Sequence, residues 1–356
     1  MRLLQPTAQL YLFLFALCVP AVQAADAFVL GSIEAPRGSL RSGYLEIPPG
    51  EDGGERVPVS VLHGARPGPV LALVAGTHGY EYPPITALQR VRRELDPAML
   101  SGTVILVHIA NPPSFLGRTI YYSPADGKNL NRVYPGRADG TLSERIAHVI
   151  TQEVIERSDY LVDLHGGDGN EALRPYVYMP LTGNRELDAA TKGMAMAFGL
   201  DHIVIDAARL RDRDDSLYVD QTALTRGKPA ITTETGQLGS NDERWVRMAE
   251  HGVYNLLRHL EMLDGEVREN KGIVWLTDYQ VIASPETGVF RAEVRDGYAI
   301  AEGGLLGVLF DFFGDEVAEV RAPFAGVVNY VVATPPVSKG EPLAMVSRVK
   351  EGADSD

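Results

Sequence analysis

The feature that most constrains the fold is the alternation of continuous apolar runs with helical patterns. Apolar runs occupy residues 69–75, 103–110, 160–165 and 229–234. Apolar residues recur at helical spacing within 85–95, after Thr141, near 186–198 and near 244–263. Strands that are apolar on both sides and separated by helices are typical of a parallel sheet with both faces covered. The sequence therefore predicts an α/β fold with a mostly parallel central sheet and helices on both faces.

The regions on either side of this alternation indicate β structure instead. Short alternating stretches broken by turns precede it, in residues 25–68. The helical pattern stops after about residue 268, and 269–350 are rich in valine, glycine and short alternations. We therefore predict a catalytic domain over 25–268, a small all-β C-terminal domain over 269–350 and an acidic tail at 351–356. The C-terminal domain is expected to form a wall of the active-site cleft.

The N-terminus has the pattern of a secretory signal. Arg2 is followed by a ten-residue apolar run at 10–19, and Val22-Gln23-Ala24 fits a cleavage site. The alternative, a membrane anchor, is disfavoured because this run is short for a membrane span. We predict a signal peptide at 1–24 and an exported protein, either periplasmic or secreted. Cys18, the only cysteine, lies within it, so the mature chain has no disulfide and no cysteine nucleophile.

The charge balance limits the classes of partner. The chain has 33 basic and 47 acidic residues and a formal net charge of −14. Such a chain does not favour nucleic acid or an anionic membrane as a partner, although a local basic site can still bind an anionic small molecule. We expect a small-molecule or short-peptide substrate with a free carboxylate, and no stable membrane insertion after signal cleavage. The sequence leaves the oligomeric state open.

Polar residues stand where the apolar runs end. His78 and Glu81 follow the first run, Asn111 follows the second, His165 ends the third and Glu234 ends the last. The carboxyl ends of parallel strands share one edge of a sheet, where ligands bind. Two histidines and one glutamate can hold one zinc ion and leave a position open for water. Glu234 is then free to act as general base toward the zinc-bound water.

Each of these short motifs has a structural alternative. A His-x-x-Glu pair is common by chance, and His78 with Glu81 would also suit a surface turn with a local ion pair. Asn131 and Arg132 lie in a loop rich in Asp, Gly, Asn and Pro, where an arginine fork and a neighbouring amide can bind a carboxylate. An arginine that only holds loop carbonyls is the alternative there.

Taken together, the motifs resemble those of one family. "GTHGYE", "NPPSF", "DGKNLNRVYPG", "DLHGG" and "ITTETG" occur in the order seen in the succinylglutamate desuccinylase/aspartoacylase family of the zinc carboxypeptidase superfamily. The resemblance covers about residues 40–345. It implies one zinc per chain, held by His78, Glu81 and His165, and Glu234 as general base. It also implies that Asn131 and Arg132 bind a substrate carboxylate. Arg118 is the candidate for an arginine that polarises the scissile carbonyl.

The chain departs from the family pattern in two respects. Named members are intracellular enzymes of amino-acid metabolism, whereas this chain carries a predicted signal peptide. The second arginine often found two positions after the Arg118 site is Ile120 here. The first departure leaves the substrate open, and the second indicates a different arrangement for binding anions.

Three functions are compatible with these observations. The favoured one is an exported zinc-dependent deacylase that cleaves the amide bond of an N-acyl amino acid, with Glu234 as general base. The alternative is a metallocarboxypeptidase that acts on short or cell-wall peptides. A non-enzymatic binding protein that keeps the fold is disfavoured because the zinc ligands and Glu234 are all present. The sequence has no Gly-x-Ser-x-Gly, His-Glu-x-x-His or phosphate-loop motif of other hydrolase classes.

Overall fold

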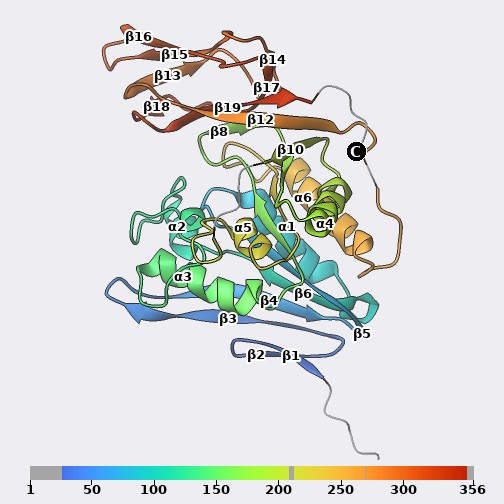
Figure 1. The fold of residues 1–356 in the computed structure, drawn as a ribbon. Helices are drawn as coiled ribbons and strands as arrows, with labels where there is room; N and C mark the ends of the chain where they lie inside the picture. Colours follow the sequence, from blue (N-terminus) through green and yellow to red (C-terminus); the bar gives the residue numbers. More distant parts are fainter. Residues whose placement is uncertain (1–25, 208–211, 269, 351–356) are drawn as a thin grey trace, which may run out of the picture.

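The computed structural model describes residues 26–207, 212–268 and 270–350 (Figure 1). The predicted signal peptide at 1–24 and the tail at 351–356 lie outside the described residues, so both stay predictions. None of the helices in the described part is long and apolar enough to cross a membrane.

The four apolar runs of the sequence form the centre of one large sheet. They become adjacent parallel strands in the order β6-β5-β7-β11. Their bounds are β5 (Arg66–Ala75), β6 (Ser101–Val107), β7 (Tyr160–His165) and β11 (Ala230–Glu234). The long hairpin of β3 (Ser39–Gly50) and β4 (Gly53–His63) extends this sheet antiparallel from β6. A separate two-stranded ribbon consists of β1 (Ala27–Leu30) and β2 (Ile33–Pro36).

Helices cover both faces of the central strands. On β5, Leu71 and Leu73 pack in the apolar cluster that includes α1, α4 and α6, while Ala72 and Val74 pack in the cluster that includes α3 and α5. This alternation buries β5 on both sides and confirms the predicted α/β class. The helices are α1 (Tyr82–Glu94), α2 (Pro112–Gly117), α3 (Leu142–Ile150), α4 (Arg185–Phe198), α5 (Val219–Leu224) and α6 (Glu243–His259).

Local signals in the sequence explain two helix starts. Pro83 lies in the first turn of α1, where a missing backbone N–H has no helical partner to lose. A capping box begins α3, since the Thr141 backbone N–H donates to Glu144 Oε2 at 2.8 Å. Helix α3 then continues as a short π-helical stretch, Thr151–Ile155.

The sequence did not predict the strands beyond β11. They are β9 (Tyr176–Pro180), antiparallel to β11, and β10 (His202–Asp206), parallel to β9. Both are short and mix tyrosine, histidine or aspartate with apolar residues, so they lack the continuous apolar run of the central strands. The sheet is therefore mixed beyond β11.

The C-terminal region is all β, as predicted; part of it continues the sheet of the catalytic region, and β13, β15, β16 and β18 form a separate antiparallel sheet. Strand β12 pairs parallel with β10 and antiparallel with β19, while the short β8 pairs with β17. Figure 1 shows these orange and red strands as a layer across one end of the molecule. The bounds are β8 (Glu171–Leu173), β12 (Val274–Ala283), β13 (Gly288–Ala292), β14 (Ala299–Ile300), β15 (Leu305–Phe310), β16 (Glu316–Arg321), β17 (Gly326–Val332), β18 (Pro336–Val337) and β19 (Pro342–Val349).

Candidate metal centre and active site

The three predicted zinc ligands meet at one point. His78, Glu81 and His165 are all buried, and one ligand atom from each lies within 4.8 Å of the others. His78 Nδ1 is 2.6 Å from Glu81 Oε1, and His165 Nδ1 is 2.7 Å from Glu81 Oε2. The Glu81 carboxylate thus lies between the two imidazoles, each of which presents its Nδ1 atom to the same space.

The sheet topology brings these side chains together. His78 lies in the turn after β5, and Glu81 is the N-cap residue of α1, directly after that turn. His165 is the last residue of β7, which pairs parallel with β5. A Cβ atom on Gly166 would collide with the Thr235 carbonyl oxygen, so glycine permits the close approach of the turns after β7 and β11.

The donor set fits a zinc ion. Two imidazole nitrogens and one carboxylate are a common protein ligand set of catalytic zinc. Glu81 Oε2 is buried, and its only close polar contact among the described residues is His165 Nδ1 at 2.7 Å. A buried carboxylate oxygen needs a positive partner, which a cation can supply in place of a protonated imidazole. The three residues can therefore hold one divalent ion.

The electrostatics of the cluster also favour a bound cation. Burial alone would raise the pKa of Glu81, but the charges of His165 and His78 outweigh it and lower this pKa. Burial would lower the pKa of His165, but the carboxylates of Asp163 and Glu81 raise it well above its usual range. The site thus favours positive charge between its carboxylates, which a bound dication can supply in place of protons.

Glu234 lies beside the cluster. It ends β11, where it is in register with His165 of β7 on one side and with Tyr176 of β9 on the other. Burial raises the pKa of Glu234 well above its usual range; His165 opposes this shift, and the carboxylates of Glu81 and Glu171 add to it. A carboxyl group with a raised pKa next to a metal site suits proton transfer near neutral pH.

Two supporting residues were missed in the sequence. Asp163 Oδ2 is 2.8 Å from His165 Nε2, and Asn129 Oδ1 is 3.2 Å from His78 Nε2. Such contacts fix the tautomer that leaves Nδ1 free for a metal. Asp163 is detectable in principle, because it stands two residues before His165 and side chains two apart on a strand share a face. Asn129 is not, since its contact depends on the fold of a loop.

Asn131 and Arg132 occupy a short helical turn, Leu130–Arg132, in the predicted loop. Asn131 Nδ2 donates to Asp163 Oδ2 at 3.1 Å, and its Oδ1 accepts from the Val219 N–H at 3.0 Å. Through these contacts Asn131 holds Asp163 in place behind His165. The Arg132 guanidinium lies 4.6 Å from the centre of the Tyr218 ring and is exposed. Binding of a substrate carboxylate by either residue stays a prediction.

Neither Arg118 nor Asn111 contacts the three metal-site residues within the described part of the chain. Arg118 follows α2 with an exposed side chain, where its charge opposes the rise that burial causes in the pKa of Tyr82. No contact in the described part of the chain joins Arg118 to the three metal-site residues, and its role at the carbonyl stays a prediction. Asn111 caps α2 and donates to the Thr77 carbonyl at 3.3 Å, a structural role.

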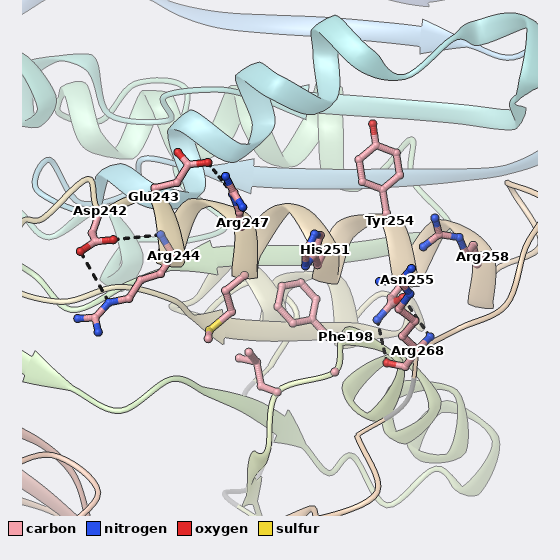
Figure 2. A pocket seen from close by; sticks show the side chains of 13 residues that line it. Phe198, Asp242, Glu243, Arg244, Arg247, His251, Tyr254, Asn255, Arg258 and Arg268 are labelled. Carbon is pink, nitrogen blue, oxygen red and sulfur yellow. Dashed lines mark hydrogen bonds and ion pairs between the residues drawn. The ribbon is translucent and has the colours of Figure 1, made fainter.

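A groove of about 840 Å³ along α6 contains none of these residues (Figure 2). Its arginines are partly neutralised within the same helix, since Arg247 pairs with Glu243 at 2.7 Å and Arg244 with Asp242 at 3.8 Å. This pattern is typical of a solvated helix face. The chemistry-bearing residues are those at the strand ends instead.

The sequence and the fold both match known proteins. Residues 67–260 match the succinylglutamate desuccinylase/aspartoacylase catalytic domain, which is more than half of the chain. The chain belongs to this family. It is 28% identical over 334 residues to the N-alpha-acetyl-L-2,4-diaminobutyric acid deacetylase of Halomonas elongata, covering 91% of this chain and 96% of that protein. The predicted family is therefore confirmed.

Solved structures of the succinylglutamate desuccinylase/aspartoacylase family share the fold. The product-bound ectoine utilization protein EutE (DoeB) from Ruegeria pomeroyi has a TM-score of 0.79 at 27% identity, over 91% of this chain and 99% of that one. A succinylglutamate desuccinylase/aspartoacylase from Rhodobacter sphaeroides has a TM-score of 0.78 at 25% identity, over 88% and 97%. The likeness covers the C-terminal β region as well as the catalytic domain.

For this member of the family, replacing Asp163 by asparagine is expected to weaken zinc binding about 10- to 100-fold. The carboxylate accepts a hydrogen bond from His165 Nε2 and raises the basicity of Nδ1, the nitrogen that would bind the ion, whereas an amide cannot do so as strongly. Competition with a chromophoric chelator measures the affinity.

A matched variant makes the reverse exchange, amide to carboxylate, behind the other histidine. Asn129→Asp places a carboxylate behind His78, where the amide oxygen now lies 3.2 Å from Nε2, and is expected to strengthen zinc binding. Unchanged affinity in both variants would show that these two contacts do not tune the ligands.

Proposed function

We propose that this protein is a zinc-dependent hydrolase that cleaves the amide bond of an N-acylated amino acid. The observation that carries the proposal is the convergence of His78, Glu81 and His165 beside Glu234. Family membership supports a deacylase. The relative from Halomonas elongata is named for the deacetylation of an N-acetylated diamino acid, which favours an acyl amino acid over a peptide. The predicted signal peptide at 1–24 would place this activity outside the cytoplasm.

The roles of the residues follow from their positions. His78, Glu81 and His165 would hold the zinc ion, which lowers the pKa of water and polarises a carbonyl when bound. Glu234 accepts a proton from the water that attacks the amide carbon, and it delivers a proton to the departing amine as the C–N bond breaks. Arg132 binds the carboxylate of the amino-acid part, and Arg118 assists at the carbonyl oxygen.

A substrate panel with metal analysis tests the proposed function. The purified protein is expected to contain one zinc per chain and to hydrolyse N-acetyl amino acids, with activity lost on chelation and restored by added zinc. Short cell-wall peptides are expected to be poor substrates. Hydrolysis of peptides alone would establish the carboxypeptidase instead. Full activity without bound metal would refute the role of His78, Glu81 and His165.

A further inference from the structure

Two carboxylates lie near the metal site and have no part in the proposed mechanism. Asp168 and Glu171 belong to the segment that follows His165, and strand β8 within it pairs antiparallel with β17 of the C-terminal region. Ala172 packs against the apolar core of the C-terminal region, while Leu173 packs with Tyr176 and Tyr330. Because side chains alternate along a strand, Glu171 shares the face of Leu173 and points away from that core.

Tyr121 connects this acidic pair to the metal site. Its ring lies edge-on to the His78 ring, with the ring centres 5.9 Å apart. Its hydroxyl donates to Glu171 Oε1 at 2.7 Å, and its backbone N–H donates to Asp168 Oδ2 at 3.0 Å. Glu171 is therefore separated from a zinc ligand by one tyrosine side chain and one hydrogen bond. The charge of Glu171 also helps to raise the pKa of Glu234 beside the cluster.

The two carboxylates lie in acidic surroundings. Burial raises the pKa of Asp168 to about 6 and that of Glu171 to about 7, and the charge of Glu81 adds to both shifts. The positive charge of a protonated His78 opposes the shift of Asp168. Neighbouring buried carboxylates repel one another, and a ligand that brings a positive charge relieves this repulsion. Glu171 as a whole residue is partly exposed, although burial of its carboxyl group raises its pKa.

We infer that Glu171, supported by Asp168, selects a substrate whose side chain carries a positive charge, such as the ammonium group of an N-acylated diamino acid. This inference rests on the proposed function. Each Glu171 oxygen keeps a lone pair beyond its present hydrogen bond, so the carboxylate can accept from an ammonium group without releasing Tyr121 or the Asp168 N–H. Ile120 beside Tyr121 offers no charge for a second substrate carboxylate.

The test compares substrates that differ in side-chain charge. Nα-acetyl-2,4-diaminobutyrate and Nα-acetylnorvaline have side chains of equal length, and only the first is cationic; Nα-acetylaspartate supplies an anion. The wild type is expected to prefer the cationic substrate in kcat/KM by about tenfold or more, as for a charge-assisted contact. Glu171→Gln is expected to lower kcat/KM about 10- to 100-fold for the cationic substrate and to leave the neutral one within a few-fold.

The ratio of the kcat/KM values of two substrates, measured on one preparation, does not depend on the fraction of the enzyme that is folded. Glu171→Asp keeps the charge and is expected to keep the direction of the preference, which covers the case of a glutamine variant that does not fold. Glu302→Gln, at an exposed glutamate of the C-terminal region, is the matched control. If Glu171→Gln lowered kcat/KM equally for both substrates, Glu171 would only hold the loop, and the inference would be wrong. A wild type that does not prefer the cationic substrate would also overturn it. Hydrolysis of the neutral substrate meanwhile tests the proposed function separately.

Discussion

Replacing Glu234 by glutamine is expected to lower kcat by a factor of about 10²–10⁴ while the protein keeps its zinc. Glutamine has nearly the same shape, and the three metal-site residues remain in place, but an amide cannot accept the proton of the attacking water. Glu234 is in register with His165, so its carboxyl group is presented at the same edge of the sheet as the cluster. Steady-state kinetics on an N-acetyl amino acid and metal analysis of the same preparation measure the two quantities.

The control for this variant is Glu46→Gln, at an exposed glutamate of β3. It is expected to keep both activity and zinc. If Glu234→Gln turned over substrate as fast as the wild type, Glu234 would not be the base. If it lost zinc together with activity, Glu234 would belong to the metal site and the proposed division of roles would be wrong.

Replacing Glu81 by glutamine is expected to abolish both zinc binding and activity. The Glu81 carboxylate is buried between the imidazoles of His78 and His165, with one oxygen close to the Nδ1 atom of each. An amide removes the negative charge of the ligand set and presents an N–H group toward the ion. If the metal acts as the Lewis acid, we expect the variant to lose more than about a thousandfold in activity at micromolar zinc.

Thermal unfolding with and without zinc gives a second readout for Glu81→Gln. Zinc at a hundredfold excess over its Kd would stabilise the wild type by about 2.7 kcal/mol, a rise in Tm of about 4 °C for a chain of this size. The variant is expected to show no zinc-dependent rise, whereas Glu46→Gln should behave like the wild type. A zinc-dependent rise in the variant equal to that of the wild type would contradict the assignment of Glu81 as a ligand.

The central strands and the candidate ligands could be predicted because their signals are local. An apolar run that ends in a polar residue identifies both a buried strand and the side chain at its end, as for His165 and Glu234. Strands β9 and β10 could not be predicted in this way, since tyrosine, histidine and aspartate interrupt their apolar pattern. The pairing of β12 with β10, which joins the C-terminal region to the catalytic sheet, has no local signal either.

The sequence by itself determined the α/β class, the all-β character of the C-terminal region and the identity of the three candidate ligands with Glu234. Only the tertiary structure decided which residues support them: Asp163 behind His165, Asn129 behind His78, and Tyr121 between His78 and Glu171. Residue type and strand position follow from short stretches of chain, because burial imposes a periodic pattern on them. Contacts between loops depend on how distant segments pack, and the linear order of residues does not specify that packing.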